Sequence, residues 1–496
     1  MEPVLTPTEM AAADARTIGA GTPVEVLMDR AGRAVSWAVR RRLDGVYGKH
    51  VVAVCGKGNN GGDGRIAARV LRGWGVGVDE FLLESGVDRR AFERALARAD
   101  VAIDAMYGTG FRGALAGDVA WIAEQLRAVE VVAVDVPSGV NGLTGAVEGV
   151  AVRADETVCF AALKSGLCFE PGRSYAGRLT VVDIGIDIGV ASSDGWSLPL
   201  GIVERADVAP LITTRAADAH KWRTGVLVIG GSGGMIGAPL LVSHAAMRAG
   251  AGIVWCGVPG GAAARAASGS EVITKALPAT REGALADEVL KLPFERFAAV
   301  VVGPGLGTHA QTAQAVRRLV SEVPVPLVLD ADGLNALHGD PELLQQRPAA
   351  TVVTPHEGEY ERLMGQPVGE HRVDAAQRLA AAANCVALLK GPGTVVAHPD
   401  GRAVVVPTGG RELATAGSGD VLSGVIGGVL AGAGLPYEAT AAAAYVHGYA
   451  GRLAAPRGAV APVGVVASDL VAALPRTLAE IQTDPLSFSN PTRPGM

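Results

Sequence analysis

The stretch Val51–Gly64 reads Val-Val-Ala-Val-Cys-Gly-Lys-Gly-Asn-Asn-Gly-Gly-Asp-Gly. Its apolar first half predicts a buried strand, and its second half is a glycine-rich loop of the kind that aims backbone N–H groups at an anion. The glycines match the dinucleotide fingerprint Gly-x-Gly-x-x-Gly. However, Asn59, Asn60 and Asp63 stand where a hydride-transfer enzyme needs small residues. We therefore expect cation coordination or hydrogen bonds to a polar ligand; the alternative is a turn held by its own side chains.

A second loop of another kind, Thr415–Gly424, reads Thr-Ala-Gly-Ser-Gly-Asp-Val-Leu-Ser-Gly. It precedes a run of small apolar residues that predicts a buried helix. Bare backbone amides at a helix start, with the carboxylate of Asp420 beside them, are what phosphoryl transfer needs. The alternative is that Asp420 only caps the helix. Two such loops in one chain predict two active sites.

Composition limits the class of protein. With 496 residues, the chain is expected to form two or three domains, and its 49% hydrophobic and 19% charged residues are typical of a soluble globular protein. A net charge of −6 argues against nucleic-acid binding. Five scattered cysteines indicate no disulfide framework and no ordinary zinc site. We see no secretory signal and no membrane span, and therefore expect a cytoplasmic enzyme.

Short apolar runs alternate with helical patterns along the chain, which predicts an α/β protein with mainly parallel sheets. The pattern breaks between about residues 188 and 219, so we place a domain boundary near Pro210. The expected domains are residues 1–210 and 211–481, followed by a disordered tail at 482–496. Strands are expected at residues 51–54, 76–83, 101–103, 131–134, 156–160, 179–182, 226–229, 252–256, 299–302, 327–329, 351–353, 386–389, 394–397 and 402–406. Helices are expected at residues 23–42, 65–72, 88–99, 117–128, 239–250, 311–322 and 374–383.

Two more polar segments follow strands of the first domain. Asp104 ends one strand and precedes the loop Gly108–Ala114, in which Arg112 is suited to a phosphate group. Asp135 ends the next strand and is followed by Val-Pro-Ser, with Ser138 last. Ligands of open parallel sheets bind beyond the carboxyl ends of the strands. All three segments are therefore expected to meet in one crevice.

These three motifs, in this order, resemble the YjeF N-terminal family of NAD(P)H-hydrate epimerases, over about residues 10–187. The resemblance implies a Rossmann-like three-layer sandwich and a potassium ion held by Asn60, Asp104 and Ser138. It also implies contacts to the hydrate from Asn59, Asn60, Gly61, Gly62, Asp63, Gly108, Thr109, Gly110, Phe111, Arg112, Gly113, Ala114 and Asp135.

The residue types suit that chemistry. Epimerisation of a nicotinamide hydrated at C6 needs water to leave one face and return to the other, and a nearby carboxylate can move the proton. If Asp104 holds the cation, Asp135 is the better base. Lys164 binds phosphate or stabilises an intermediate in one interpretation, and is merely solvated in the other.

The second half carries further strand-end motifs. Gly-Pro-Gly-Leu-Gly occupies 303–307, Thr-Pro-His-Glu-Gly-Glu 354–359 and Lys-Gly-Pro-Gly-Thr 390–394. His356 stands beside two glutamates at a strand end, and we favour a ligand role over a structural one. Glu357 and Glu359 are candidates to hold Mg²⁺ through water.

With the motifs around His220, Arg248 and Asp330, this half resembles the ribokinase-like ADP/ATP-dependent NAD(P)H-hydrate dehydratases, over about residues 218–474. The resemblance implies Asp420 as the general base. It also implies hydrate contacts from Ala238, Gly305, His356 and Asp420, and adenine-nucleotide contacts from Lys390, Gly391, Pro392, Gly393, Thr394 and Gly419. Met235, and the segment 409–414, depart from the family pattern.

The sequence thus predicts a bifunctional enzyme that repairs hydrated NADH and NADPH. One domain interconverts the R and S hydrates, and the other uses ADP or ATP, with Mg²⁺, to dehydrate the S form. The resemblance also suggests ADP as co-substrate and a homo-oligomer. One alternative is a ribokinase-like small-molecule kinase with a nucleotide-sensing N-terminal domain. Another is an N-terminal domain that serves as an interaction or RNA-binding scaffold.

Overall fold

The computed structural model of the chain describes residues 1–189, 195–213, 218–260, 271–456 and 463–483. It divides into two compact units, one of residues 2–194 and the other of Met1 with residues 195–496. The division precedes the boundary predicted near Pro210. The reason is that β9 (Leu200–Ile202) pairs in parallel with β18 (Ala403–Val406), so the chain has already entered the second unit before Pro210.

The first unit contains a parallel sheet in the order β3-β2-β4-β5-β6-β8. Each of the six strands expected there is confirmed. Their bounds are β2 His50–Cys55, β3 Gly77–Leu82, β4 Val101–Ala105, β5 Glu130–Val134, β6 Glu156–Phe160 and β8 Arg178–Val182. The sequence pattern did not predict the short strands β1 (Glu2–Leu5) and β7 (Leu163–Lys164), which pair with each other.

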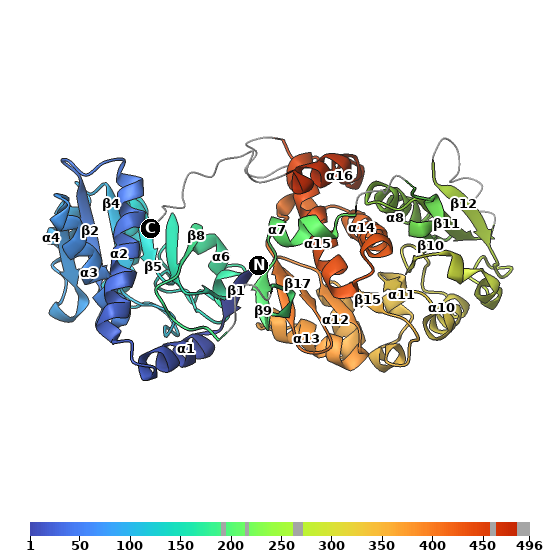
Figure 1. The fold of residues 1–496 in the computed structure, drawn as a ribbon, viewed down its shortest axis with the longest axis horizontal. Coiled ribbons are helices and arrows are strands. Elements are labelled where there is room, and N and C mark those ends of the chain that lie inside the picture. The colour runs from blue at the N-terminus through green and yellow to red at the C-terminus, as the bar shows by residue number, and fades with distance from the viewer. Residues whose placement is uncertain (190–194, 214–217, 261–270, 457–462, 484–496) are drawn as a thin grey trace. The chain divides into compact units, whose positions relative to one another are not determined.

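Helices cover both faces of this sheet (Figure 1). Alternate strand residues point to opposite faces: Val51 and Ala53 pack with one set of helices, and Val52 and Val54 with the other. Strands buried on both faces account for the unbroken apolar runs in the sequence. The helices are α1 Pro7–Gly19, α2 Val24–Leu43, α3 Asn59–Gly73, α4 Arg89–Leu96, α5 Gly117–Gln125 and α6 Gly172–Tyr175.

In the second unit the strands follow the order β12-β11-β10-β13-β14-β15-β16-β17-β18-β9. Pairing is parallel except where β17 lies antiparallel to β16 and β18. All eight strands expected here are present; β9 and β12 were missed. The remaining bounds are β10 Gly225–Ile229, β11 Ile253–Pro259, β12 Ile273–Leu277, β13 Ala299–Val302, β14 Leu327–Leu329, β15 Thr351–Val353, β16 Val386–Leu389 and β17 Thr394–Ala397.

The run of small residues after Val421 forms a buried helix, as expected. Alanine and glycine allow α14 (Ser418–Ala433) to approach α8 (Gly237–Arg248) closely, since a side chain at Gly424 would overlap the Val242 carbonyl. No helix in the described part of the chain is long and apolar enough to cross a lipid bilayer. The other helices of this unit are α7 Arg205–Val208, α10 Ala310–Glu322, α11 Asp332–Asn335, α12 Glu357–Met364, α13 Arg372–Ala383, α15 Pro436–Ala454 and α16 Ala467–Gln482. Because α16 includes Gln482, the predicted tail begins too early; residues 484–496 lie outside the described residues.

Candidate functional site

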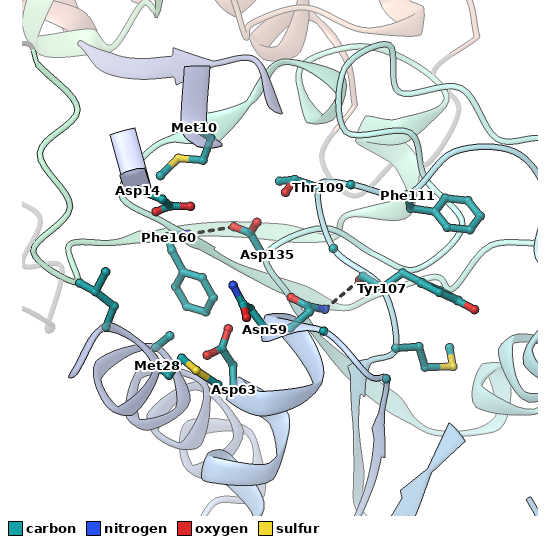
Figure 2. Close-up of a pocket in the computed structure, with 18 of the residues that line it drawn as sticks. Met10, Asp14, Met28, Asn59, Asp63, Tyr107, Thr109, Phe111, Asp135 and Phe160 are labelled. Atoms are coloured by element: carbon teal, nitrogen blue, oxygen red, sulfur yellow. Dashed lines mark hydrogen bonds between the residues drawn. The ribbon is translucent and has the colours of Figure 1, made fainter. Parts of the chain in front are cut away.

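The first unit contains a cavity of about 980 Å³ at the carboxyl ends of β2, β4 and β5 (Figure 2). The crevice expected from the three strand-end motifs is therefore present. Predicted residues that line it are Asn59, Asn60, Asp63, Gly108, Thr109, Gly110, Phe111, Arg112 and Asp135. Gly61, Gly62, Gly113 and Ala114 are not among the lining residues.

The polar loop of the first motif is not a turn. Helix α3 begins at Asn59, with Gly58 as its N-cap, so the asparagines and Asp63 lie on the first two helical turns. The helix begins six residues earlier than expected because its glycines remove clashes. A side chain at Gly61 would overlap the Gly56 carbonyl, and one at Gly62 would overlap the Met28 side chain. The glycines thus bring the helix N-terminus, which attracts anions, to the cavity wall.

The residues predicted to hold potassium lie together: Asn60 lines the cavity, whereas Asp104 and Ser138 are not among its lining residues. Both oxygens of the fully buried Asp104 carboxylate accept hydrogen bonds from Ser138: one from its hydroxyl at 2.6 Å, the other from its N–H at 2.7 Å. Asn60 donates to the Tyr107 carbonyl at 2.8 Å, and the Tyr107 N–H donates to the Ser138 hydroxyl at 2.9 Å. Burial raises the pKa of Asp104 to about 6, although the hydrogen bonds from Ser138 and Met106 act in the opposite direction.

Asp135 and Lys164 form a buried ion pair that lines the cavity. The Lys164 ammonium donates to Asp135, to the Phe160 carbonyl at 2.8 Å and to the Ala162 carbonyl at 3.2 Å. Its side chain is 1% exposed, which excludes the solvated interpretation. Asp135 is held in the left-handed backbone region at φ 64°, an uncommon conformation for a residue with a side chain. It also accepts a hydrogen bond from the Phe160 N–H at 3.2 Å. Backbone strain of this kind is often found at functional sites.

Two further carboxyl groups face this cavity (Figure 2). Burial raises the pKa of Asp63 to about 8, and the nearby charges of Asp135 and Asp14 add to the shift. Burial also raises the pKa of Asp14, which lies on α1. Sequence reasoning missed Asp14. The available signal was a carboxylate in the helical stripe Met10, Asp14, Ile18, whose members all line the cavity.

In the second unit, the polar motifs follow successive parallel strands. Gly303 follows β13, Asp330 follows β14, Thr354 follows β15 and Lys390 follows β16. A side chain at Gly303, where φ is 131°, would overlap the Asp330 carbonyl. The glycine therefore lets adjacent strand ends meet at the edge where α/β proteins bind ligands.

Lys390 links these strand ends. Its ammonium lies 2.8 Å from an Asp330 oxygen and 3.5 Å from a Glu359 oxygen, and Ser423 on α14 donates to the other Asp330 oxygen at 2.6 Å. Burial alone would lower the pKa of Lys390, but the two carboxylates raise it above its ordinary value. Lys390 therefore carries a full positive charge next to Gly419, since a Cβ placed on that glycine would lie 3.6 Å from the ammonium nitrogen.

Asp420 lies in the first turn of α14. Gly417 precedes this helix and has the left-handed backbone conformation, with φ 86°. The N-cap of α14 is Gly417 rather than Asp420, which disfavours the capping alternative. Burial raises the pKa of Asp420 to about 6; Asp330 raises it further, and Lys390 lowers it. The group is a carboxylate at neutral pH, with a proton affinity suited to a general base.

His356 is exposed and oriented. Its Nδ1 accepts hydrogen bonds from the N–H groups of Gly358 at 3.0 Å and Glu359 at 3.2 Å, so it is the N-cap of α12. This cap leaves Nε2 3.5 Å from a Glu359 oxygen. Glu357 is exposed and pairs with Arg372, whereas Glu359 is buried and faces Lys390. The two glutamates therefore do not converge on one site for Mg²⁺.

Ala238 and Gly305 lie close together: a Cβ placed on Gly305 would lie 3.3 Å from that of Ala238. The Gly305 carbonyl accepts from Ser232 at 2.9 Å. Met235, one of the two departures from the family pattern, is exposed beside Gly305. In the other departure, residues 411–413 form one 3₁₀ turn that buries Glu412.

The predicted nucleotide loop is the hairpin turn between β16 and β17, and Arg372 holds it by donating to the Lys390 carbonyl at 2.9 Å. A buried cation, bare helix-start amides and a half-buried carboxylate thus meet at one sheet edge. The other unit has a separate cavity lined by carboxyl groups. Together these features define an enzyme with two α/β units that each carry a site.

Comparisons with known proteins identify the family. Residues 226–476 match the model of the NAD(P)H-hydrate dehydratase family, and residues 24–96 and 84–166 match that of the YjeF-related protein N-terminus. The chain is 40% identical to the bifunctional NAD(P)H-hydrate repair enzyme Nnr of Moorella thermoacetica, over 93% of this chain and 94% of that one. It is 39% identical to the enzyme of the same name from Salinibacter ruber, over 96% of both chains.

A solved structure agrees with this identification. An ADP/ATP-dependent NAD(P)H-hydrate dehydratase from Bacillus subtilis, co-crystallised with ATP and Mg²⁺, is 30% identical with a TM-score of 0.50 and covers 57% of this chain and 98% of its own. The chain belongs to the family of bifunctional NAD(P)H-hydrate repair enzymes. This confirms the family and the fold class predicted from the motifs.

Proposed function

We propose that the chain repairs hydrated NADH and NADPH. In this proposal the first unit interconverts the R and S hydrates, and the second unit converts the S hydrate and ADP to NAD(P)H, AMP and phosphate. The observation that carries the proposal is the half-buried Asp420 carboxylate beside Lys390 at the start of α14.

The geometry of the second unit supports a phosphoryl-transfer step. Asp420 accepts the proton of the C6 hydroxyl as that oxygen attacks a phosphoryl group. The α14 N–H groups at Gly419 and the Lys390 ammonium stabilise the negative charge that develops on the phosphoryl oxygens. The phosphorylated oxygen is then a good leaving group, and loss of phosphate with a C5 proton restores the nicotinamide. Ala238, Gly305 and His356 are proposed to hold the hydrate, and residues 390–394 the nucleotide.

Magnesium fits this site as a partner of the nucleotide. Within the described residues, no group of three His, Cys, Asp or Glu side chains could hold a metal ion. Mg²⁺ commonly binds through substrate phosphates with few protein ligands. We propose that it enters with ADP or ATP and neutralises phosphate charge.

We propose that Asp135 of the first unit moves the proton of the water that leaves and returns at C6. Lys164 fixes the position of the Asp135 carboxylate. Asn60, Asp104 and Ser138 offer only oxygen ligands for a cation, and the Tyr107 carbonyl lies among them. A hard monovalent cation such as K⁺ suits this set. It would pull the Asn60 and Tyr107 segments together at the cavity wall.

The experiment supplies purified R and S NADH hydrates separately, each with ADP and Mg²⁺, and follows NADH absorbance, AMP and phosphate. The proposal expects NADH from both hydrates, with AMP and phosphate formed in equal amounts. A small-molecule kinase would leave a stable phosphorylated product and no NADH. A first unit that is only a scaffold would leave the R hydrate unused beyond its spontaneous rate.

Three further expectations belong to this proposal. The enzyme acts in the cytoplasm on small molecules, without nucleic acid or membrane partners. It prefers ADP over ATP. It assembles as a homo-oligomer. A thermal-shift comparison of ADP, ATP, NADH and K⁺, with light scattering for the assembly, tests the last two.

A further inference from the structure

The cavity of the first unit holds a carboxyl group that its surroundings leave without a partner. Asp63 is 6% exposed, and its Oδ1 accepts no hydrogen bond from the protein. Buried polar atoms of folded proteins are nearly always paired. Because Asp63 lines the cavity, this oxygen is available to a molecule that binds there (Figure 2).

The charges around Asp63 favour its neutral form. Asp135, after β5, and Asp14, on α1, both face it with negative charge, and burial withdraws it from water; these effects raise its pKa to about 8. The positive end of α3 acts in the opposite direction. Of the cationic side chains that line the cavity, Lys164 is already engaged by Asp135 and two backbone carbonyls. A neutral carboxyl group can donate a proton, which a carboxylate cannot.

Asp135 stands in the contrasting environment, ion-paired with Lys164 and bonded by the Phe160 N–H. The same cavity therefore contains the Asp63 carboxyl group, which has no positively charged partner, and the Asp135 carboxylate, which is paired with Lys164. Pairs of titratable groups in such contrasting environments serve as acid and base in enzymes.

Building on the proposed epimerase activity, we propose that Asp63 is the catalytic acid of the first unit. It protonates the C6 oxygen of the hydrate as the C6–O bond breaks, while Asp135 acts as the base when water returns to the opposite face.

The ring-nitrogen lone pair forms the N1=C6 double bond, the C6–O bond breaks, and the oxygen leaves as water carrying the Asp63 proton. Water then adds to the other face of C6, the N1=C6 electron pair returns to nitrogen, and the second proton passes to Asp135. Exchange with water in the open cavity restores the two carboxyl groups. No oxidant or reductant is needed, and C5 keeps its protons.

The test uses the full chain with Asp63→Asn, which keeps the shape of the side chain but cannot act as an acid. Turnover of the R hydrate is measured with ADP present, and turnover of the S hydrate in the same preparation reports the second unit. We expect kcat for the R hydrate to fall about 10²-fold to 10³-fold, with KM within about threefold. Asp63→Glu should recover part of the rate. Asp118→Asn, an exposed carboxylate of the same unit that pairs with Arg89, is the matched control.

Two readouts do not depend on the variant's activity. In the wild-type enzyme, kcat for the R hydrate should decline as the pH rises through about 8, because the acid form is lost. The infrared difference spectrum between wild type and Asp63→Asn should contain a neutral carboxylic-acid band at pH 7.

The outcomes separate this proposal from the function on which it rests. An Asp63→Asn enzyme with wild-type kcat, or one that changes only KM, overturns the acid role while the epimerase stands. A wild-type rate that does not decline above pH 8 does the same, even if the variant fails to fold. A wild-type enzyme that leaves the R hydrate untouched overturns both.

Discussion

Each unit holds a lysine beside a carboxylate at its candidate site, but the surroundings of the two lysines differ. In the first unit, Lys164 donates to Asp135 and to two backbone carbonyls, and its side chain is 1% exposed. In the second, Lys390 contacts Asp330 and Glu359, is 18% exposed and lies beside Gly419 at a helix start. The first arrangement fixes a carboxylate in place. The second presents positive charge where a phosphoryl group can bind.

The unpaired carboxyl groups of the two sites differ accordingly. Burial raises the pKa of both, to about 8 for Asp63 and to about 6 for Asp420. Asp63 faces two anions, whereas Asp420 faces one anion and the Lys390 cation. Burial, together with these nearby charges, therefore makes Asp63 an acid and Asp420 a base at neutral pH.

The largest expected effect comes from Asp420→Asn. Loss of the general base should lower kcat for S-hydrate dehydration about 10³-fold, which corresponds to about 4 kcal/mol of barrier. R-to-S conversion by the first unit should continue, and chromatographic separation of the two epimers measures it in the same sample. Asp287→Asn, an exposed carboxylate that pairs with Arg318, is the control. Equal loss of both activities would contradict the assignment of separate sites to the two units.

Lys164→Met tests whether Lys164 serves chiefly to hold the Asp135 carboxylate in place. The substitution leaves the Asp135 carboxylate, whose side chain is 13% exposed, without its counter-charge. We expect it to destabilise the first unit by about 3 kcal/mol. Hydrogen exchange of peptides from α2 and β2 in the full chain measures this.

The matched control for Lys164→Met is Lys49→Met. It removes the exposed ion pair with Asp100, which should cost less than about 1 kcal/mol. Similar costs for the two variants would contradict the buried role of Lys164.

Epimerisation and dehydration should depend on pH in opposite directions: epimerisation should slow as the pH rises, and dehydration should slow as the pH falls. Asp420 must be ionised to act as a base, so dehydration should be lost as the pH falls through about 6. Removing the neighbouring cation with Lys390→Gln should move this acidic limb upward by about one pH unit, or about 1.4 kcal/mol. Rates for the S hydrate at saturating substrate between pH 5 and 9 measure the limb. A limb that stays in place would show that Lys390 does not face Asp420.

Sequence reasoning predicted most strands because they are buried on both faces and read as unbroken apolar runs. It missed β1, β7, β9 and β12, whose few residues carry no periodic pattern. It also placed the start of α3 after the glycines, because glycine disfavours helices. In the fold these glycines are required: a side chain at Gly61 would overlap the Gly56 carbonyl. Close packing between segments that are far apart in the sequence determines where α3 begins. The helix propensity of the local residues carries no information about that packing.

The candidate site residues show the same limit. Asp135 was selected because it ends a strand, which is a local pattern. Asp14 was missed because its helix reaches the cavity only through the tertiary fold. The burial of Lys164 could not be predicted because the carbonyls of Phe160 and Ala162, which replace water around its ammonium, accept its hydrogen bonds only in the folded turn.

The smallest expected effect concerns His447 on α15, whose ring contacts the start of α14 at the second site. Its Nε2 lies 3.2 Å from the Ser418 hydroxyl at the start of α14, and burial lowers its pKa to about 4. The ring is therefore neutral at working pH and positions the helix start through one hydrogen bond. His447→Gln should lower kcat for dehydration about fivefold, or about 1 kcal/mol, the value of one such bond.

His309→Gln, an exposed histidine that caps α10, is the control. The His447 variant also separates stability from catalysis. In wild type the unfolded chain binds this proton more readily than the folded one, so the second unit loses stability as the pH falls from 6.5 towards 4. His447→Gln removes that loss while the acidic limb set by Asp420 should stay near pH 6. If the limb moved with the variant, His447 rather than Asp420 would carry the titration, and the contrast between the two sites would fail.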